Sequence, residues 1–146
     1  MKLLKAIIAG FAGATVLNIL HEGVRRFNPD APRVDLLGEE ALSRSLNSLN
    51  INPPQGDNLY AATLVGDLLS NTIYYSAIGM GGRKNILLKG AVAGLTAGIG
   101  AVKLPEKMGL DDKPVTKTTT TKILTVTWYL VGGIATALVF DRISKK

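Results

Sequence analysis

Residues 123–140 read Ile-Leu-Thr-Val-Thr-Trp-Tyr-Leu-Val-Gly-Gly-Ile-Ala-Thr-Ala-Leu-Val-Phe and contain no charged side chain. Lys122 precedes this run, and Asp141 and Arg142 follow it. Eighteen uncharged and mostly apolar residues are enough to cross the hydrocarbon core of a membrane as one helix. The stretch therefore predicts a membrane-spanning helix near the carboxyl end of the chain.

Three other segments of the 146-residue chain have a similar character. The second contains a single charged residue, Asp67, and the third carries Lys89 near its start. We predict an all-α fold, a four-transmembrane-helix bundle that forms a single integral membrane domain over residues 1–146. The proposed spans cover residues 3–25, 59–81, 85–103 and 121–142.

The first apolar segment follows Lys2 and Lys5, a pattern that secretory signal peptides share. Cleavage after Ala14 would leave an apolar core that is too short for such a signal. We therefore expect a retained spanning helix.

The composition fits a membrane bundle and excludes several kinds of site. Apolar residues make up 47% of the chain, Gly occurs 16 times, and the charged residues cluster between the apolar segments. Cysteine is absent, which excludes disulfides, thiolate nucleophiles and Cys-ligated metals. The net charge of +6 comes from Lys and Arg that flank apolar segments without interleaved aromatics. This pattern favours contact with lipid headgroups over nucleic-acid binding.

Four spans place both chain termini on one side of the membrane, which we name side A. Side B carries nine basic and nine acidic residues, so the positive-inside rule gives a mixed signal. We favour a cytoplasmic side A in the cytoplasmic (inner) membrane, because its basic residues lie in short segments. Side A holds one acid, Asp141, and seven basic residues: Lys2, Lys5, Arg83, Lys84, Arg142, Lys145 and Lys146.

The long loop over residues 27–57 contains a short amphipathic pattern. Asp35 is a favourable residue to cap a helix, and Leu42, Leu46 and Leu49 then follow at helical spacing. The pattern predicts an interfacial helix that lies on the membrane. An alternative interpretation is a lid or a partner-binding surface over side B.

Small residues recur every four positions in several spans and predict close helix packing. Such glycine-zipper spacing specifies close contact but does not identify the partner. Packing within one chain and a homo-oligomeric interface both remain open. The predicted packing residues are Gly10, Gly90, Gly94, Gly98, Gly132 and Gly133.

The second span also carries a polar face around Asp67 that includes Tyr60 and Ser70. A carboxylate inside a span costs about 2.5–3.5 kcal/mol on insertion scales, so it should face the bundle interior or a water-filled cavity. At 1.5 Å per residue, the end of the first span reaches a similar depth. We predict a polar vestibule that opens to side B and contains Asn18, His21, Glu22, Arg25, Thr63, Asp67, Asn71 and Tyr74.

Three functions fit these features. The leading hypothesis is a channel- or transporter-like protein with its vestibule centred on Asp67. The second is a non-catalytic structural or assembly subunit that packs through its glycine faces, with the bilayer, a second copy or another membrane protein as partner. The third is a membrane-embedded enzyme acting on a lipid headgroup, with His21 and Glu22 as acid and base and Arg25 holding phosphate.

The sequence favours a protein without catalytic activity. It contains no HExxH, GxSxG, P-loop or dinucleotide-binding motif. His21 and Glu22 are adjacent, so their side chains diverge around a helix. We therefore predict neither a metal site nor a cofactor.

Overall fold

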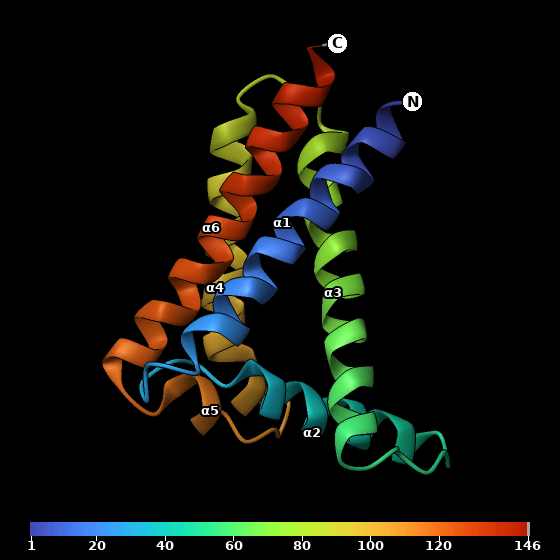
Figure 1. Cartoon of the computed structure of the whole chain (residues 1–146), viewed down its shortest axis with the longest axis vertical. Coiled ribbons are helices and arrows are strands. Elements are labelled where there is room, and N and C mark those ends of the chain that lie inside the picture. The colour runs from blue at the N-terminus through green and yellow to red at the C-terminus, as the bar shows by residue number, and fades with distance from the viewer. Residues whose placement is uncertain (146) are drawn as a thin grey trace.

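The computed structural model describes residues 1–145, so Lys146, counted above on side A, lies outside the described residues. All the regular elements of the described chain are helices, which confirms the predicted all-α class. Both termini lie at the same end, here end A, and the opposite end is end B (Figure 1). The helices are α1 (Lys2–Val24), α2 (Val34–Ser48), α3 (Asp57–Met80), α4 (Ile86–Lys107), α5 (Lys113–Thr116) and α6 (Thr119–Ser144).

Among the described residues, α1, α4 and α6 are long and apolar enough to cross a membrane. Helix α3 has 24 residues and is long enough to cross a membrane, but it is not among these candidates. The polar face around Asp67 makes it less hydrophobic than the other three long helices. The chain is thus a membrane-embedded helical protein with three clear candidate spans. A fourth span through α3 stays a prediction.

The burial pattern is that of a protein whose surroundings are lipid. Large apolar side chains, such as Ile7, Phe11, Ile73 and Leu95, lie exposed on the long helices. In water this arrangement would leave a very large apolar surface exposed. In a bilayer, lipid tails cover that surface and small residues allow the helices to pack closely. The fully buried positions include Ala6, Ala9, Ala14, Thr121, Thr125, Thr136 and Ala137.

The long helices pack as two close pairs. Helix α1 lies against α3, α4 lies against α6, and contacts between α1 and α6 join the pairs. Helices α3 and α4 are consecutive in the chain but touch much less. The view in Figure 1 shows the resulting spread at end B, where α2 runs across the ends of the long helices.

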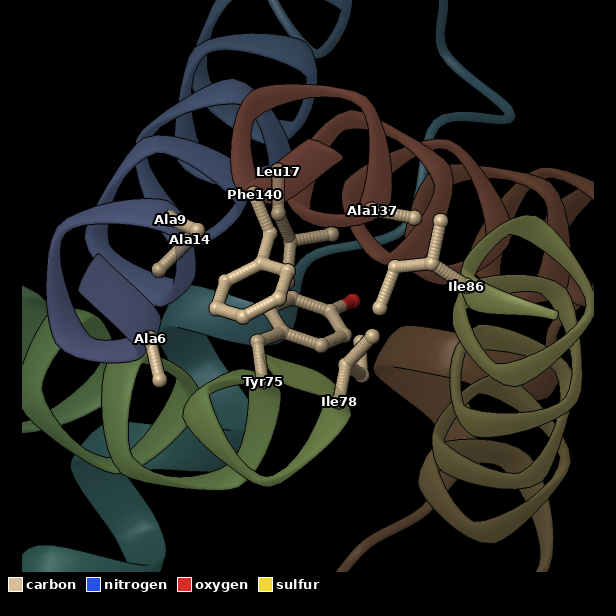
Figure 2. Packing of buried hydrophobic residues seen from close by; sticks show 9 residues of the cluster. All are labelled: Ala6, Ala9, Ala14, Leu17, Tyr75, Ile78, Ile86, Ala137 and Phe140. Carbon is tan, nitrogen blue, oxygen red and sulfur yellow. The ribbon is translucent and has the colours of Figure 1, made fainter. Parts of the chain in front are cut away.

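The apolar core lies toward end A, between α1, α3 and α6, with Ile86 added from the start of α4 (Figure 2). Tyr75 is fully buried there, and its hydroxyl donates a 2.8 Å hydrogen bond to the backbone carbonyl of Tyr129. The Phe140 ring packs so closely on Gly79 that a Cβ at Gly79 would lie 2.6 Å from it. This core fills the space between α1, α3 and α6 on the end-A side of the structure.

All six predicted packing glycines contact another helix of the same chain. A Cβ placed on Gly94 would lie 2.6 Å from Leu130 Cα, and one on Gly98 would lie 2.7 Å from Val126 Cα. These faces are therefore filled within one chain, and no room remains on them for a second copy. The other contacts pair Gly10 with Ser76, Gly132 with Tyr75, and Gly133 with Gly90.

The elements at end B differ from the sequence expectation in their boundaries. Helix α4 continues four residues past the predicted end at residue 103, through Pro105, and stops at Lys107. Gly109 ends it with φ +73, and the Leu110 amide donates to the Pro105 carbonyl. This is a Schellman motif, in which a left-handed glycine closes the last turn. Pro105 has no amide hydrogen, so α4 lacks one backbone hydrogen bond in its last turns.

The expected amphipathic helix in the first long loop is α2, but Asp35 does not cap it. Arg33 occupies the N-cap position and makes no capping hydrogen bond with its side chain. Asp35 instead lies in the first turn and is buried, with 8% of its surface exposed. Its carboxylate has arginine partners, which are described below.

Candidate functional site

A cavity of about 220 Å³ lies between α1, α2 and α3 in the end-B half of the structure. Val34 and Leu42 of α2 and Leu64 of α3 form apolar parts of its wall. Three carboxylates also line it, and no lysine or arginine does. The polar lining residues are Asn18, His21, Glu22, Asp35, Tyr60, Thr63, Asp67 and Ser70.

The cavity brings together five of the eight predicted vestibule residues. These are Asn18, His21, Glu22, Thr63 and Asp67. They come from facing turns of α1 and α3, because the two helices lie side by side at this depth.

The other three predicted residues do not line the cavity. Arg25 binds carboxylates at its edge, and Asn71 lies one turn beyond Asp67 and binds it. The Tyr74 hydroxyl donates to the Ala93 carbonyl of α4 at 2.9 Å, away from the cavity. The spacing of Tyr74 places it on the polar face of α3. That face is wide, so one part of it lines the cavity beside α1 and another part contacts α4.

Asp67 has amide contacts but no counter-charge. Asn71 Nδ2 donates to Asp67 Oδ1 at 3.0 Å. Within residues 1–145, the ion pairs involve other carboxylates and none reaches Asp67. A partly buried carboxylate inside a helical bundle therefore faces the cavity without a basic partner.

Two buried groups at the cavity lack hydrogen-bond partners. His21 is 3% exposed, and neither of its ring nitrogens is bonded, although the ring edge meets Tyr129 with centroids 5.8 Å apart. The Thr63 hydroxyl is buried and unbonded as well. Leaving such a group unsatisfied costs about 1–3 kcal/mol. Water or a polar ligand in the cavity would satisfy both groups.

A network of five side chains ties α1, α2 and α3 together at the edge of the cavity. Arg25 donates to Glu22 at 2.7 Å and to Asp35 at 3.2 Å. Arg33 donates to the same Asp35 carboxylate at 2.7 Å. The Tyr60 hydroxyl completes the network by bonding both Glu22 and Arg25.

The network also sets the charge balance of the site. Burial by itself would raise the pKa of Asp35, but the hydrogen bond and charge of Arg33, with the charge of Arg25, outweigh it. The pKa of Asp35 therefore lies below its ordinary value. The two arginines balance Glu22 and Asp35, so an ionised Asp67 is the unbalanced charge. A cation in the cavity would balance that charge.

Sequence reasoning placed Tyr60 and Ser70 on the polar face around Asp67 but did not include them in the vestibule, although both line the cavity. It missed Asp35 as a member of the site. No local pattern connects Asp35 with Arg25, because their contact depends on how α2 folds back over α1.

Neither a metal centre nor a phosphate site is formed by these residues. Within residues 1–145, no group of three or more His, Asp and Glu side chains is placed to hold a metal ion. Arg25 is engaged by two carboxylates, and a phosphate would have to displace them.

Comparisons of this chain with protein-family models, with curated proteins and with solved structures find no match. The geometry of the cavity is therefore the basis for a functional assignment. Its main elements are an unbalanced carboxylate, two unsatisfied buried polar groups and a partly apolar wall.

Proposed function

We propose that this protein is transporter-like and takes a cation, either a proton or an organic cation, into the cavity from end B. Asp67 would be the binding carboxylate, with His21 beside it as a second group able to exchange a proton. The observation that carries the proposal is the placement of Asp67 on a cavity without a basic partner. Ionisable groups inside membrane bundles commonly mark such pathways.

The core at end A favours a carrier over an open pore. Asp67 lies 13 residues before Met80, or roughly 20 Å from the end of α3 at 1.5 Å per residue. Tyr75 and Phe140 belong to the core that packs between α1, α3 and α6 over that distance. A cation that reaches Asp67 would therefore need a rearrangement to leave at end A. The two close helix pairs are suitable bodies for such alternating access.

The proposal includes α3 as a fourth span. Near end A, a Cβ on Gly10 of α1 would lie 2.5 Å from Ser76 Oγ of α3. Near end B, Glu22 of α1 accepts a hydrogen bond from Tyr60 of α3. Helix α3 thus follows α1 over its length and would share its depth in the bilayer. End A has an excess of basic residues, so it would lie on the cytoplasmic side of an inner membrane.

Flux measurements in proteoliposomes test this function. Wild-type protein should take up protons or tetramethylammonium, a permanently charged cation, under an imposed membrane potential. Asp67→Asn should reduce that uptake at least about tenfold, since removal of a buried ionic contact costs more than about 1.4 kcal/mol. Asp57→Asn is the matched control, because Asp57 is exposed in the first turn of the same helix. Equal uptake by wild type and Asp67→Asn would reject the proposal.

A second candidate function, an assembly subunit, is favoured by one surface of α3. Ala62, Gly66 and Ser70 line the cavity and are also exposed at four-residue spacing, and a Cβ on Gly66 would meet nothing within 4 Å. Such a face can receive a helix of a second copy or of another membrane protein. Gly66→Leu should then abolish a complex detected by crosslinking, whereas Asp67→Asn should leave it intact.

A further inference from the structure

An apolar groove adjoins the cavity on the outer side of α1 and α3. Its volume is about 300 Å³, and Phe11, Ile19 and Leu68 form much of its wall. Phe11 and Ile19 are more than half exposed, so the groove lies on the lipid-facing surface. Asn18, Glu22 and Leu64 line both the groove and the cavity. The two hollows are therefore neighbours, and these three residues lie between them.

The groove offers little to a polar ligand. The Thr15 hydroxyl donates to the Phe11 carbonyl at 2.8 Å, and Asn18 Nδ2 donates to the Ala14 carbonyl at 3.0 Å. The Thr15 hydroxyl hydrogen and one of the two Asn18 amide hydrogens are thus used within α1. What remains is an apolar channel of the kind that an alkyl chain fills.

The cavity end of this combined site offers acceptors and negative charge. Asp67 has no ion-pair partner, and the buried Thr63 hydroxyl is unbonded. A neutral His21 ring would supply one more acceptor nitrogen. An alkylammonium group carries three donors and one positive charge, so it matches this set.

We propose that the cavity and groove together bind a single-chain amphiphile with a primary ammonium headgroup. The ammonium lies at Asp67 within the cavity, and the alkyl chain lies between α1 and α3 in the groove. This inference rests on the proposed function and names the class of its organic cation. A phosphate-bearing headgroup is disfavoured, because Arg25 and Arg33 are both paired with carboxylates.

Photolabelling of the full chain in phosphatidylcholine nanodiscs tests the inference. The probe is dodecylammonium with a diazirine at the end of its chain, and mass spectrometry locates the labelled residues. Labelling should concentrate within residues 11–22 and 64–68. Asp67→Asn should reduce it about tenfold, the equivalent of one buried charged contact. Asp57→Asn should label like the wild type.

Unlabelled competitors separate the contributions of the two hollows. Excess dodecylammonium should block labelling, whereas dodecanol and ethylammonium at equal concentration should not. Equal blocking by ethylammonium would overturn the role of the groove but leave cation binding at Asp67 standing. Equal blocking by lysophosphatidylethanolamine would show that a lipid headgroup with phosphate is accepted, contrary to the inference. Tetramethylammonium uptake tests the proposed function separately, because that cation has no chain.

A second variant keeps the inference testable if Asp67→Asn does not fold. Ile19→Trp changes only an exposed side chain of the groove, so the helical content and elution volume should stay those of the wild type. Its larger ring should fill the groove and reduce labelling within residues 11–22 by about tenfold. Labelling equal to the wild type, or spread evenly over all lipid-facing helices, would overturn the inference.

Discussion

The Tyr60 hydroxyl of α3 donates a 2.5 Å hydrogen bond to the Glu22 carboxylate of α1. The same hydroxyl accepts a bond from Arg25, which in turn reaches Asp35 of α2. One phenol therefore joins the three helices that surround the cavity. The site has a fixed edge of paired charges and an interior in which Asp67 is unpaired.

Tyr60→Phe should loosen this edge. The variant loses two hydrogen bonds to charged partners, for an expected loss of about 1–3 kcal/mol in the free energy of unfolding. The measurement is the thermal midpoint in detergent, followed by circular dichroism. Tyr74→Phe is the control, because it removes a single bond to the backbone of Ala93. A Tyr60→Phe midpoint at or above that of Tyr74→Phe would contradict the role of the network.

Two glycine substitutions should have opposite effects. Gly94→Ala places a Cβ 2.6 Å from the backbone of Leu130, so α4 and α6 must separate, at an expected cost of about 1–3 kcal/mol. The Cβ added by Gly66→Ala would have no atom within 4 Å. This variant should stabilise α3 by up to about 1 kcal/mol, because alanine has the higher helix propensity. Thermal midpoints of the two variants give the comparison. Equal midpoints would show that the α4–α6 contact is looser than described.

Stability should depend on pH through Asp35. Its folded-state pKa lies below the unfolded value of about 3.9, so its ionised form stabilises the fold above that pH. This contribution is lost as the pH falls through the folded-state pKa. Asp35→Asn should therefore lower the thermal midpoint at pH 7 and lie closer to the wild type at pH 3. A difference of the same size at both pH values would contradict the pairing with Arg25 and Arg33.

Much of the fold and part of the site could be predicted from the sequence. Apolar runs and the 3.6-residue period locate the long helices, because both depend on local sequence. Depth along a helix places Asn18 and His21 near Asp67, because the rise per residue is fixed. Four-residue glycine spacing predicts close contact, but the choice of α6 as the partner of α4 depends on tertiary packing.

The remaining features depend on contacts between distant segments. Asp35 follows the usual pattern of a capping residue, yet two arginines hold its carboxylate. Pro105 suggests a helix end, but Gly109 supplies the left-handed turn that terminates α4. The polar face of α3 includes Tyr74, which lies about 10 Å beyond Asp67 along the helix and meets α4 instead of the cavity.

The most direct test of the account compares two single-cysteine variants in α3, which is possible because the chain has no cysteine of its own. Asp67→Cys and Ile73→Cys are reconstituted in vesicles and treated with a water-soluble methanethiosulfonate reagent, which requires a hydrated thiolate. Ile73 is 74% exposed on the surface assigned to lipid. The account predicts rapid modification of Asp67→Cys and protection of Ile73→Cys. Rapid modification of Ile73→Cys, or protection of Asp67→Cys, would contradict it.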